Sequence, residues 1–250
     1  MFYLHVANRT ETLLQRLAFI LEEDRQQNFF APELFLIQSQ GMERMVAQGL
    51  ADRFGSFCNF QFFLPLNFLG YIAERLDLGI SPDVFDRQIL TWRLDDLLRD
   101  HTGVEFQPLA AYMAGENSEL KRFQLARRLA NIFDQYQVLR PEYLASWEAG
   151  KVATDHPAEP WQAALWRRLL DQPGGGTHRG MLFRRVIEKL QGENDLSKFL
   201  PKRISVIGLH TMPPIFLEYL NRLAGHMDIH LLLLSPCRHY WGDVESRRTE

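Results

Sequence analysis

Short apolar runs near both ends of the chain constrain its fold more than any other feature. Between runs 2–6 and 34–37, and again between runs 204–209 and 229–234, apolar residues repeat at helical spacing. Runs without polar alternation are typical of strands buried on both faces of a parallel sheet, with helices as the crossover connections. The runs are 2–6, 34–37, 204–209 and 229–234, with 59–63 as a weaker fifth candidate.

Helical periodicity dominates the middle of the chain. A helix is expected at 42–54, and the whole of 65–191 reads as helices and short loops. We therefore expect an α/β fold in which residues 1–75 and 200–250 form a parallel sheet domain, interrupted by a helical insertion at 76–199. Because the chain stops soon after its last buried-type strand, we also expect it to be the front part of a longer protein.

Composition narrows the class of protein. Of 250 residues, 28 are Lys or Arg and 31 are Asp or Glu, giving a net charge of −3. This charge excludes a protein that coats nucleic acid through an overall positive potential. No apolar run approaches the roughly 18 residues that span a bilayer, and the N-terminus lacks a secretory signal. Cys58 and Cys237 stand apart without metal-ligand spacing, which favours a reducing cytoplasm.

A phosphate-binding loop is missing where one would be expected. The turn at Ser39, Gln40 and Gly41 connects a buried-type strand to a helix, yet no Gly-Lys-Ser or Gly-Lys-Thr sequence follows. The Gly150-Lys151 pair follows no strand, and no G-x-G-x-x-G occurs. We therefore do not expect an ATPase or a dinucleotide enzyme.

The histidines do not form a recognisable catalytic or metal set. His5, His210 and His230 flank or lie in expected strands, where a structural histidine with a satisfied hydrogen bond is the favoured interpretation. His226 and His230 straddle an expected helix end and strand start, which breaks metal-ligand geometry.

The helix expected at 119–140 carries an excess of basic residues, and two interpretations remain open. It is either a solvated helix face or a track for phosphates. Near its end, Asp134, Gln135 and Arg140 have the groups that read base edges, but they equally suit capping and ion pairing at a helix terminus.

Several short motifs, in order along the whole chain, resemble the RecC family, whose members are subunits of the RecBCD (exonuclease V) enzyme. They are F-L-I-Q-S-Q-G-M at 35–42, Phe62, Leu64, Pro65 and Phe68, F-D-Q-Y at 133–136, Arg140-Pro141, and Cys237, Arg238, Tyr240, Trp241, Gly242 and Asp243.

The resemblance implies a vestigial superfamily 1 helicase-like fold, a P-loop-type parallel sheet without the P-loop. It implies a non-catalytic DNA-binding and scaffold role in double-strand break repair by homologous recombination, scanning the 3′-ended single strand for a Chi-like sequence. Implied partners are RecB-like and RecD-like subunits in a heterotrimer, and single-stranded and duplex-end DNA, with no membrane. No cofactor is expected in this chain, because the partner subunits use the ATP and Mg.

The resemblance also implies which residues contact DNA, and some depart from the best-known pattern. We expect these departures to change the octamer-like signal or its stringency. The matching positions are Gln38, Leu64, Asp134, Gln135, Arg140 and Arg179. The departures are Gln40 for Thr, Arg44 for Gln, Gly70 for Trp, Asn131 for Asp and, more mildly, Ile132 for Leu.

Two alternatives remain. One is the inactive-helicase half of an AddB-type nuclease, although such chains usually keep a nucleotide loop near the start. The other is an α/β enzyme with an unrecognised nucleotide or metal site, which ATP binding by this chain would favour.

Overall fold

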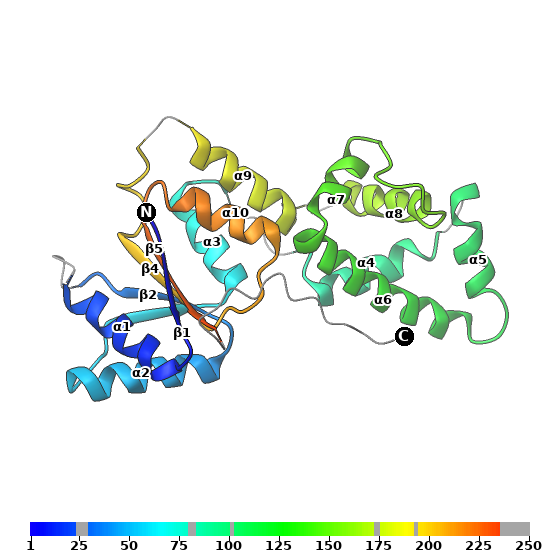
Figure 1. The fold of residues 1–250 in the computed structure, drawn as a ribbon. Coiled ribbons are helices and arrows are strands. Elements are labelled where there is room, and N and C mark those ends of the chain that lie inside the picture. Colours follow the sequence, from blue (N-terminus) through cyan, green and yellow to red (C-terminus); the bar gives the residue numbers. More distant parts are fainter. Residues whose placement is uncertain (24–29, 80–83, 101–102, 173–175, 193–194, 236–250) are drawn as a thin grey trace, which may run out of the picture. The chain divides into compact units, whose positions relative to one another are not determined.

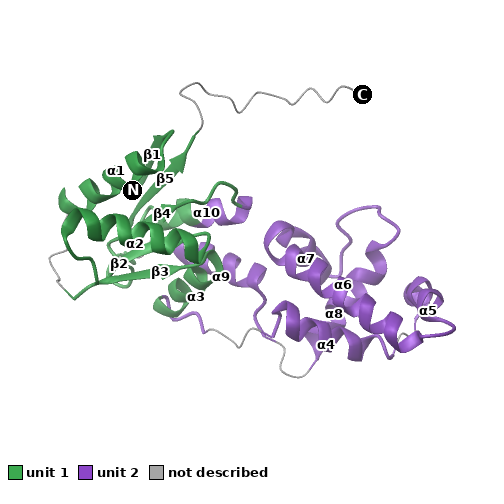
Figure 2. Cartoon of the chain, turned by 90° about the horizontal axis from the view of Figure 1, so that it is seen from below, with its two compact units in different colours: residues 1–75, 192–212, 220–250 green, residues 76–191, 213–219 purple. Residues whose placement is uncertain are grey.

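The computed structural model describes residues 1–23, 30–79, 84–100, 103–172, 176–192 and 195–235 (Figure 1). The chain divides into two compact units (Figure 2). Unit 1 comprises residues 1–75, 192–212 and 220–250, and unit 2 comprises 76–191 and 213–219. The motif that begins at Cys237 lies outside the described residues.

Unit 1 is built on a five-stranded, wholly parallel sheet with the order β1-β5-β4-β2-β3. In the register of the sheet, Phe35 lies beside Ser205 on one side and Phe62 on the other. The parallel α/β arrangement expected from the apolar runs is thereby confirmed, including the weaker fifth strand. The strands are β1 (Phe2–Ala7), β2 (Glu33–Ile37), β3 (Phe60–Phe63), β4 (Arg203–Ile207) and β5 (Asp228–Leu234).

Helices cover both faces of this sheet (Figure 1). On one face, α1 (Thr10–Glu23) and α2 (Gln40–Phe54) bury an apolar core that includes Leu17, Val46 and Phe35. On the other face, α3 (Pro65–Arg75) packs against β2 and β3. This burial removes apolar side chains from water, which is the main stabilising term of such a domain.

A buried ion pair joins β2 and β4 where both strands begin. The Arg203 side chain is 1% exposed, and its Nε and Nη2 atoms donate to the two carboxylate oxygens of Glu33 at 3.0 and 2.5 Å. Its Nη1 atom also donates to the carbonyl oxygen of Ile20 in α1. The fork geometry matches the carboxylate and compensates for the loss of hydration.

Unit 2 is helical, and its longest helix, α6 (Ser118–Leu139), packs along α4 (Arg87–Leu97). Its core contains Phe133, Trp147 and Trp166. No helix among the described residues is long and apolar enough to cross a membrane. The remaining helices are η1 (Val104–Phe106), α5 (Gln107–Met113), α7 (Pro141–Glu148), α8 (Glu159–Asp171), α9 (Arg179–Gln191) and α10 (Pro214–Leu223), the last of which ends in unit 1.

Two element boundaries differ from the expectation for local reasons. The helix expected from Met42 begins two residues earlier, because the Ser39 hydroxyl accepts a hydrogen bond from the Met42 backbone N–H at 3.4 Å and caps α2. The strand expected to reach residue 209 ends at Ile207, because Gly208 has a φ of +74°.

Candidate nucleic-acid interface

In unit 1, the implied DNA-contacting residues gather at the carboxyl edge of the sheet. Gln38 follows β2 and Leu64 follows β3, and these two strands are parallel neighbours. Both side chains are exposed. In open α/β sheets this edge is where ligands bind.

The first turn of α2 belongs to the same edge. Gln40 and Arg44 are both exposed and are four residues apart on one helix face. The turn after β4 lies against this helix start, because a Cβ atom on Gly208 would come within 2.5 Å of the Met42 Cε atom. The Met42 methyl could move aside, but the φ of +74° at Gly208 favours glycine at this turn.

Gly70 lies in α3, where a Cβ atom would meet nothing within 4 Å. The backbone at this position therefore accommodates a Cβ atom without a clash, although this chain carries no side chain there.

In unit 2, α6 turns its implied contact residues in different directions. Asn131 and Gln135 are exposed and one helical turn apart. Ile132 packs against the hydrophobic core of the unit instead. Ile132 is only half-buried, and this packing helps to hold α6 in place.

Asp134 and Arg179 form an ion pair rather than two separate groups. The Arg179 Nη1 atom donates to the Asp134 Oδ1 atom at 2.5 Å, and Arg179 Nη2 lies 3.5 Å from Asp86 Oδ2. The backbone N–H of Arg179 donates to the Gln137 side-chain oxygen at 3.0 Å, and Gln137 is fully buried. A base that approaches Asp134 thus meets a carboxylate already shared with a guanidinium.

Arg140 lies immediately after α6 and is exposed. Its guanidinium carbon lies 5.8 Å from the centre of the Tyr143 ring, and its nearest carboxylate is Glu142 at 4.0 Å. The side chain borders a hollow of about 560 Å³ that Arg184 and Glu218 also line. An exposed pair at this distance contributes little to stability, so the guanidinium is available to a ligand.

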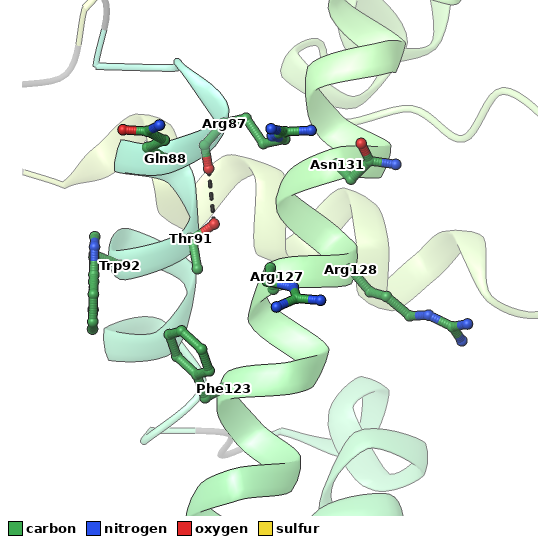
Figure 3. A pocket seen from close by; sticks show the side chains of 8 residues that line it. All are labelled: Arg87, Gln88, Thr91, Trp92, Phe123, Arg127, Arg128 and Asn131. Atoms are coloured by element: carbon green, nitrogen blue, oxygen red, sulfur yellow. Dashed lines mark hydrogen bonds between the residues drawn. The ribbon is translucent and has the colours of Figure 1, made fainter.

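A groove of about 640 Å³ between α4 and α6 was not expected from the sequence (Figure 3). It contains one implied contact residue, Asn131, together with two of the basic residues of α6, Arg127 and Arg128. The signal that could have revealed it is Trp92, a large aromatic residue outside the buried leucine stripe of α4. The α4–α6 groove is lined by Arg87, Gln88, Thr91, Trp92, Phe123, Arg127, Arg128 and Asn131.

Two of the histidines form a structural pair in the sheet. His5 Nε2 and His230 Nδ1 are 3.1 Å apart, and the His230 ring stacks on Tyr3. Burial, and then the nearby His5, lower the pKa of His230 to about 4. This confirms the structural interpretation of the two residues. Among the described residues, no group of three or more His, Cys, Asp or Glu side chains is arranged to hold a metal ion.

Comparison with known proteins gives the chain its family. Residues 2–250 match the family described as RecC, N-terminal domain. The chain belongs to the RecC family. This confirms the resemblance inferred from the short motifs.

Individual RecC relatives match almost the whole chain. The Escherichia coli K12 protein is 35% identical over 98% of this chain, that of Haemophilus influenzae 28% over 100%, and that of Mycolicibacterium smegmatis 29% over 98%. Each is described as RecBCD enzyme subunit RecC. The chain spans only 22%, 25% and 22% of the length of these relatives, respectively.

Proposed function

We propose that this chain is a non-catalytic DNA-binding and scaffold part of a RecBCD-type helicase-nuclease that acts in double-strand break repair by homologous recombination. It scans the 3′-ended single strand for a Chi-like sequence. RecB-like and RecD-like subunits supply the ATP- and Mg-dependent steps, in the cytoplasm.

The observation that carries this proposal is the exposure of the polar side chains at the implied contact positions. Gln38, Gln40 and Arg44 face solvent at the carboxyl edge of the sheet, and Asn131 and Gln135 face solvent on α6. Polar side chains in such places are free to form hydrogen bonds with base edges.

The architecture supports a helicase-derived origin. A parallel sheet covered by helices on both faces is the setting in which a P-loop ordinarily occurs, after a strand and before a helix. The corresponding turn here presents Ser39, Gln40 and Gly41 with no lysine. A sheet of this kind retains a surface for a strand of DNA without binding the phosphates of ATP.

The departures from the best-known family pattern support an altered signal. Gly70 removes a ring on which a base would stack, an interaction worth about 1–3 kcal/mol per base. Arg44 adds a guanidinium that pairs with guanine or phosphate. Asn131 both donates and accepts hydrogen bonds, whereas an aspartate only accepts them.

The test uses the natively expressed protein with any subunits that co-purify. Single-stranded DNA binding is measured by fluorescence anisotropy for the unmodified protein, for Arg140→Ala, and for the control Arg185→Ala, which changes an exposed arginine on α9. We expect Arg140→Ala alone to weaken binding.

A photoreactive ATP analogue distinguishes the enzyme alternative. Labelling of this chain at residues 38–44 would support a nucleotide site and overturn the proposal. Labelling confined to other subunits is the expected result.

A further inference from the structure

The α4–α6 groove has an excess of uncompensated positive charge. Arg87, Arg127 and Arg128 line it, and none of the three forms an ion pair within the part of the chain that the structure describes. No carboxylate is among the residues that line the groove. Three guanidiniums around one hollow create a local positive potential, although the chain as a whole is slightly acidic.

Aromatic rings lie beside these charges. The Trp92 side chain is 66% exposed, and its ring centre lies 5.5 Å from that of Phe123. Figure 3 shows the two rings toward one end of the groove, and Arg87 and Asn131 toward the other. An exposed tryptophan leaves apolar ring surface in water, and a planar base stacked on it would cover that surface.

A second hollow continues the same surface. It has a volume of about 550 Å³ and shares Arg127 and Arg128 with the groove. Tyr112, which is 51% exposed, also lines it. The two arginines therefore stand between hollows that each contain an aromatic side chain.

We propose that the α4–α6 groove binds a segment of single-stranded nucleic acid. A base stacks on Trp92, the adjacent phosphates contact Arg127 and Arg128, and Asn131 and Gln88 offer hydrogen bonds to base edges. This inference rests on the proposed function and extends the DNA-contacting surface beyond the positions that the family resemblance implies.

The chemistry of the groove favours a single strand over other occupants. In a duplex the bases are already stacked on one another, so Trp92 could not reach a base face without unstacking it. The centre of a protein interface is depleted in charge, whereas here the hollow is lined by three guanidiniums that have no ion-pair partner among the described residues. Cations that follow a backbone, interleaved with aromatic rings, are typical of single-strand binding.

The first experiment tests the stacking contact in the natively expressed protein with its co-purifying subunits. A single-stranded oligonucleotide carrying 5-iododeoxyuridine is photo-crosslinked to the protein and the products are mapped by mass spectrometry. We expect crosslinks at Trp92 or Phe123. Trp92→Ala should weaken binding about 5- to 150-fold, and Trp92→Phe should restore much of it. The control is Phe199→Ala, which removes a comparably exposed ring from unit 1.

The second experiment tests the phosphate contacts. For single strands, log K falls as log salt concentration rises, and each lost phosphate contact reduces the steepness of this fall by about 0.7. The double variant Arg127→Ala/Arg128→Ala should therefore lower it by about 1.4, whereas Arg185→Ala should leave it unchanged. A merely structural role for the two arginines would not change this slope.

The outcomes separate this inference from the proposed function. If the unmodified protein binds single strands and Arg140→Ala weakens binding, but the groove variants and crosslinks show no effect, the groove assignment is wrong and the proposed function stands. If the unmodified protein binds no single strands, the proposed function fails as well. If Trp92→Ala releases a co-purifying subunit and leaves DNA binding intact, the groove is a protein-docking surface and the inference is overturned.

Discussion

At Gly70, the backbone of α3 leaves open space where another residue would carry a side chain. The single residue therefore decides whether this surface has a stacking ring. Gly70→Trp should fold normally and should strengthen binding of single-stranded DNA by about 5- to 150-fold, because one base–ring contact contributes about 1–3 kcal/mol. Anisotropy titrations at fixed salt measure the change.

The control for that substitution is Gly70→Ala, which gains helix propensity without a ring. It should raise the free energy of unfolding by up to about 1 kcal/mol and leave DNA affinity unchanged. Equal affinities for the tryptophan and alanine variants would contradict the stacking role.

The His5–His230 pair makes stability depend on pH. Burial, with the neighbouring His5, lowers the pKa of His230 to about 4, and burial, with Arg16, lowers the pKa of His5. An unfolded histidine titrates near 6.5, so between pH 6.5 and 4 the unfolded chain binds more protons than the folded one. The free energy of unfolding therefore falls as the pH falls through this window.

His230→Phe keeps a ring beside Tyr3 and removes the titration. Between pH 7 and 4.5, its melting temperature should fall by about 2–4 °C less than that of the unmodified protein, which corresponds to about 1 kcal/mol for a half-buried group screened by solvent. Thermal denaturation followed by circular dichroism measures the difference. The control is His210→Phe, which replaces an exposed histidine and should lose as much melting temperature over this pH range as the unmodified protein. An identical loss for the two variants would show that the His5–His230 pair does not cause the pH dependence.

At the scale of elements, α6 gives unit 2 both its core and its exposed surface. One face buries Leu129 and Phe133, and the opposite face carries Asn131 and Gln135. The helix α9 is held against α6 at Gly180, where a Cβ atom would lie 2.9 Å from the Gln137 carbonyl oxygen. This close approach brings Arg179 to Asp134.

Gly180→Ala should separate the two helices locally, because the contact is with backbone and cannot rotate away. We expect the free energy of unfolding to fall by about 1–3 kcal/mol. We also expect single-stranded DNA binding to weaken as the Arg179–Asp134 pair is disturbed. Urea denaturation and anisotropy measure the two effects, with Gly70→Ala as the control in a helix without crowding. Unchanged stability would show that α9 can shift freely.

At the scale of the whole molecule, both units carry residues that the RecC resemblance assigns to DNA. A selection from a random single-stranded library, with the natively expressed protein, should return a preferred sequence that differs from the familiar Chi sequence or is less strictly discriminated. Each altered base-reading position changes discrimination by about 1–3 kcal/mol. Recovery of familiar Chi with ordinary discrimination would show that Gln40, Arg44, Gly70 and Asn131 do not alter the signal.

Reverting the departures provides the matched control. The quadruple variant Gln40→Thr/Arg44→Gln/Gly70→Trp/Asn131→Asp should shift the selected sequence toward familiar Chi. The same selected sequence before and after reversion would place the specificity elsewhere in the protein.

Local patterns in the sequence were enough to predict most elements. Short apolar-rich runs predicted all five strands, and helical spacing predicted α6 nearly to its ends. Such patterns are reliable because a buried strand or amphipathic helix repeats its environment over neighbouring residues. The boundaries at Ser39 and Gly208 depended on a cap and a left-handed turn, which periodicity does not record.

The candidate site was less accessible to local reasoning. Gln38 and Arg179 were assigned from the family resemblance, because neither stands out by spacing or composition. The sequence showed an excess of basic residues on α6, but it did not show whether they form a solvated helix face or a track for phosphates.

The sequence by itself therefore determined the fold class, the family and the absence of a P-loop motif. Only the tertiary structure shows that Ile132 packs against the core, that Asp134 forms an ion pair with Arg179, and that Trp92 and Arg127 line the same groove. The physical reason is that these contacts join side chains from different helices, with Asp134 and Arg179 separated by 45 positions. Such pairings depend on how the helices pack, which the periodicity of each helix does not specify.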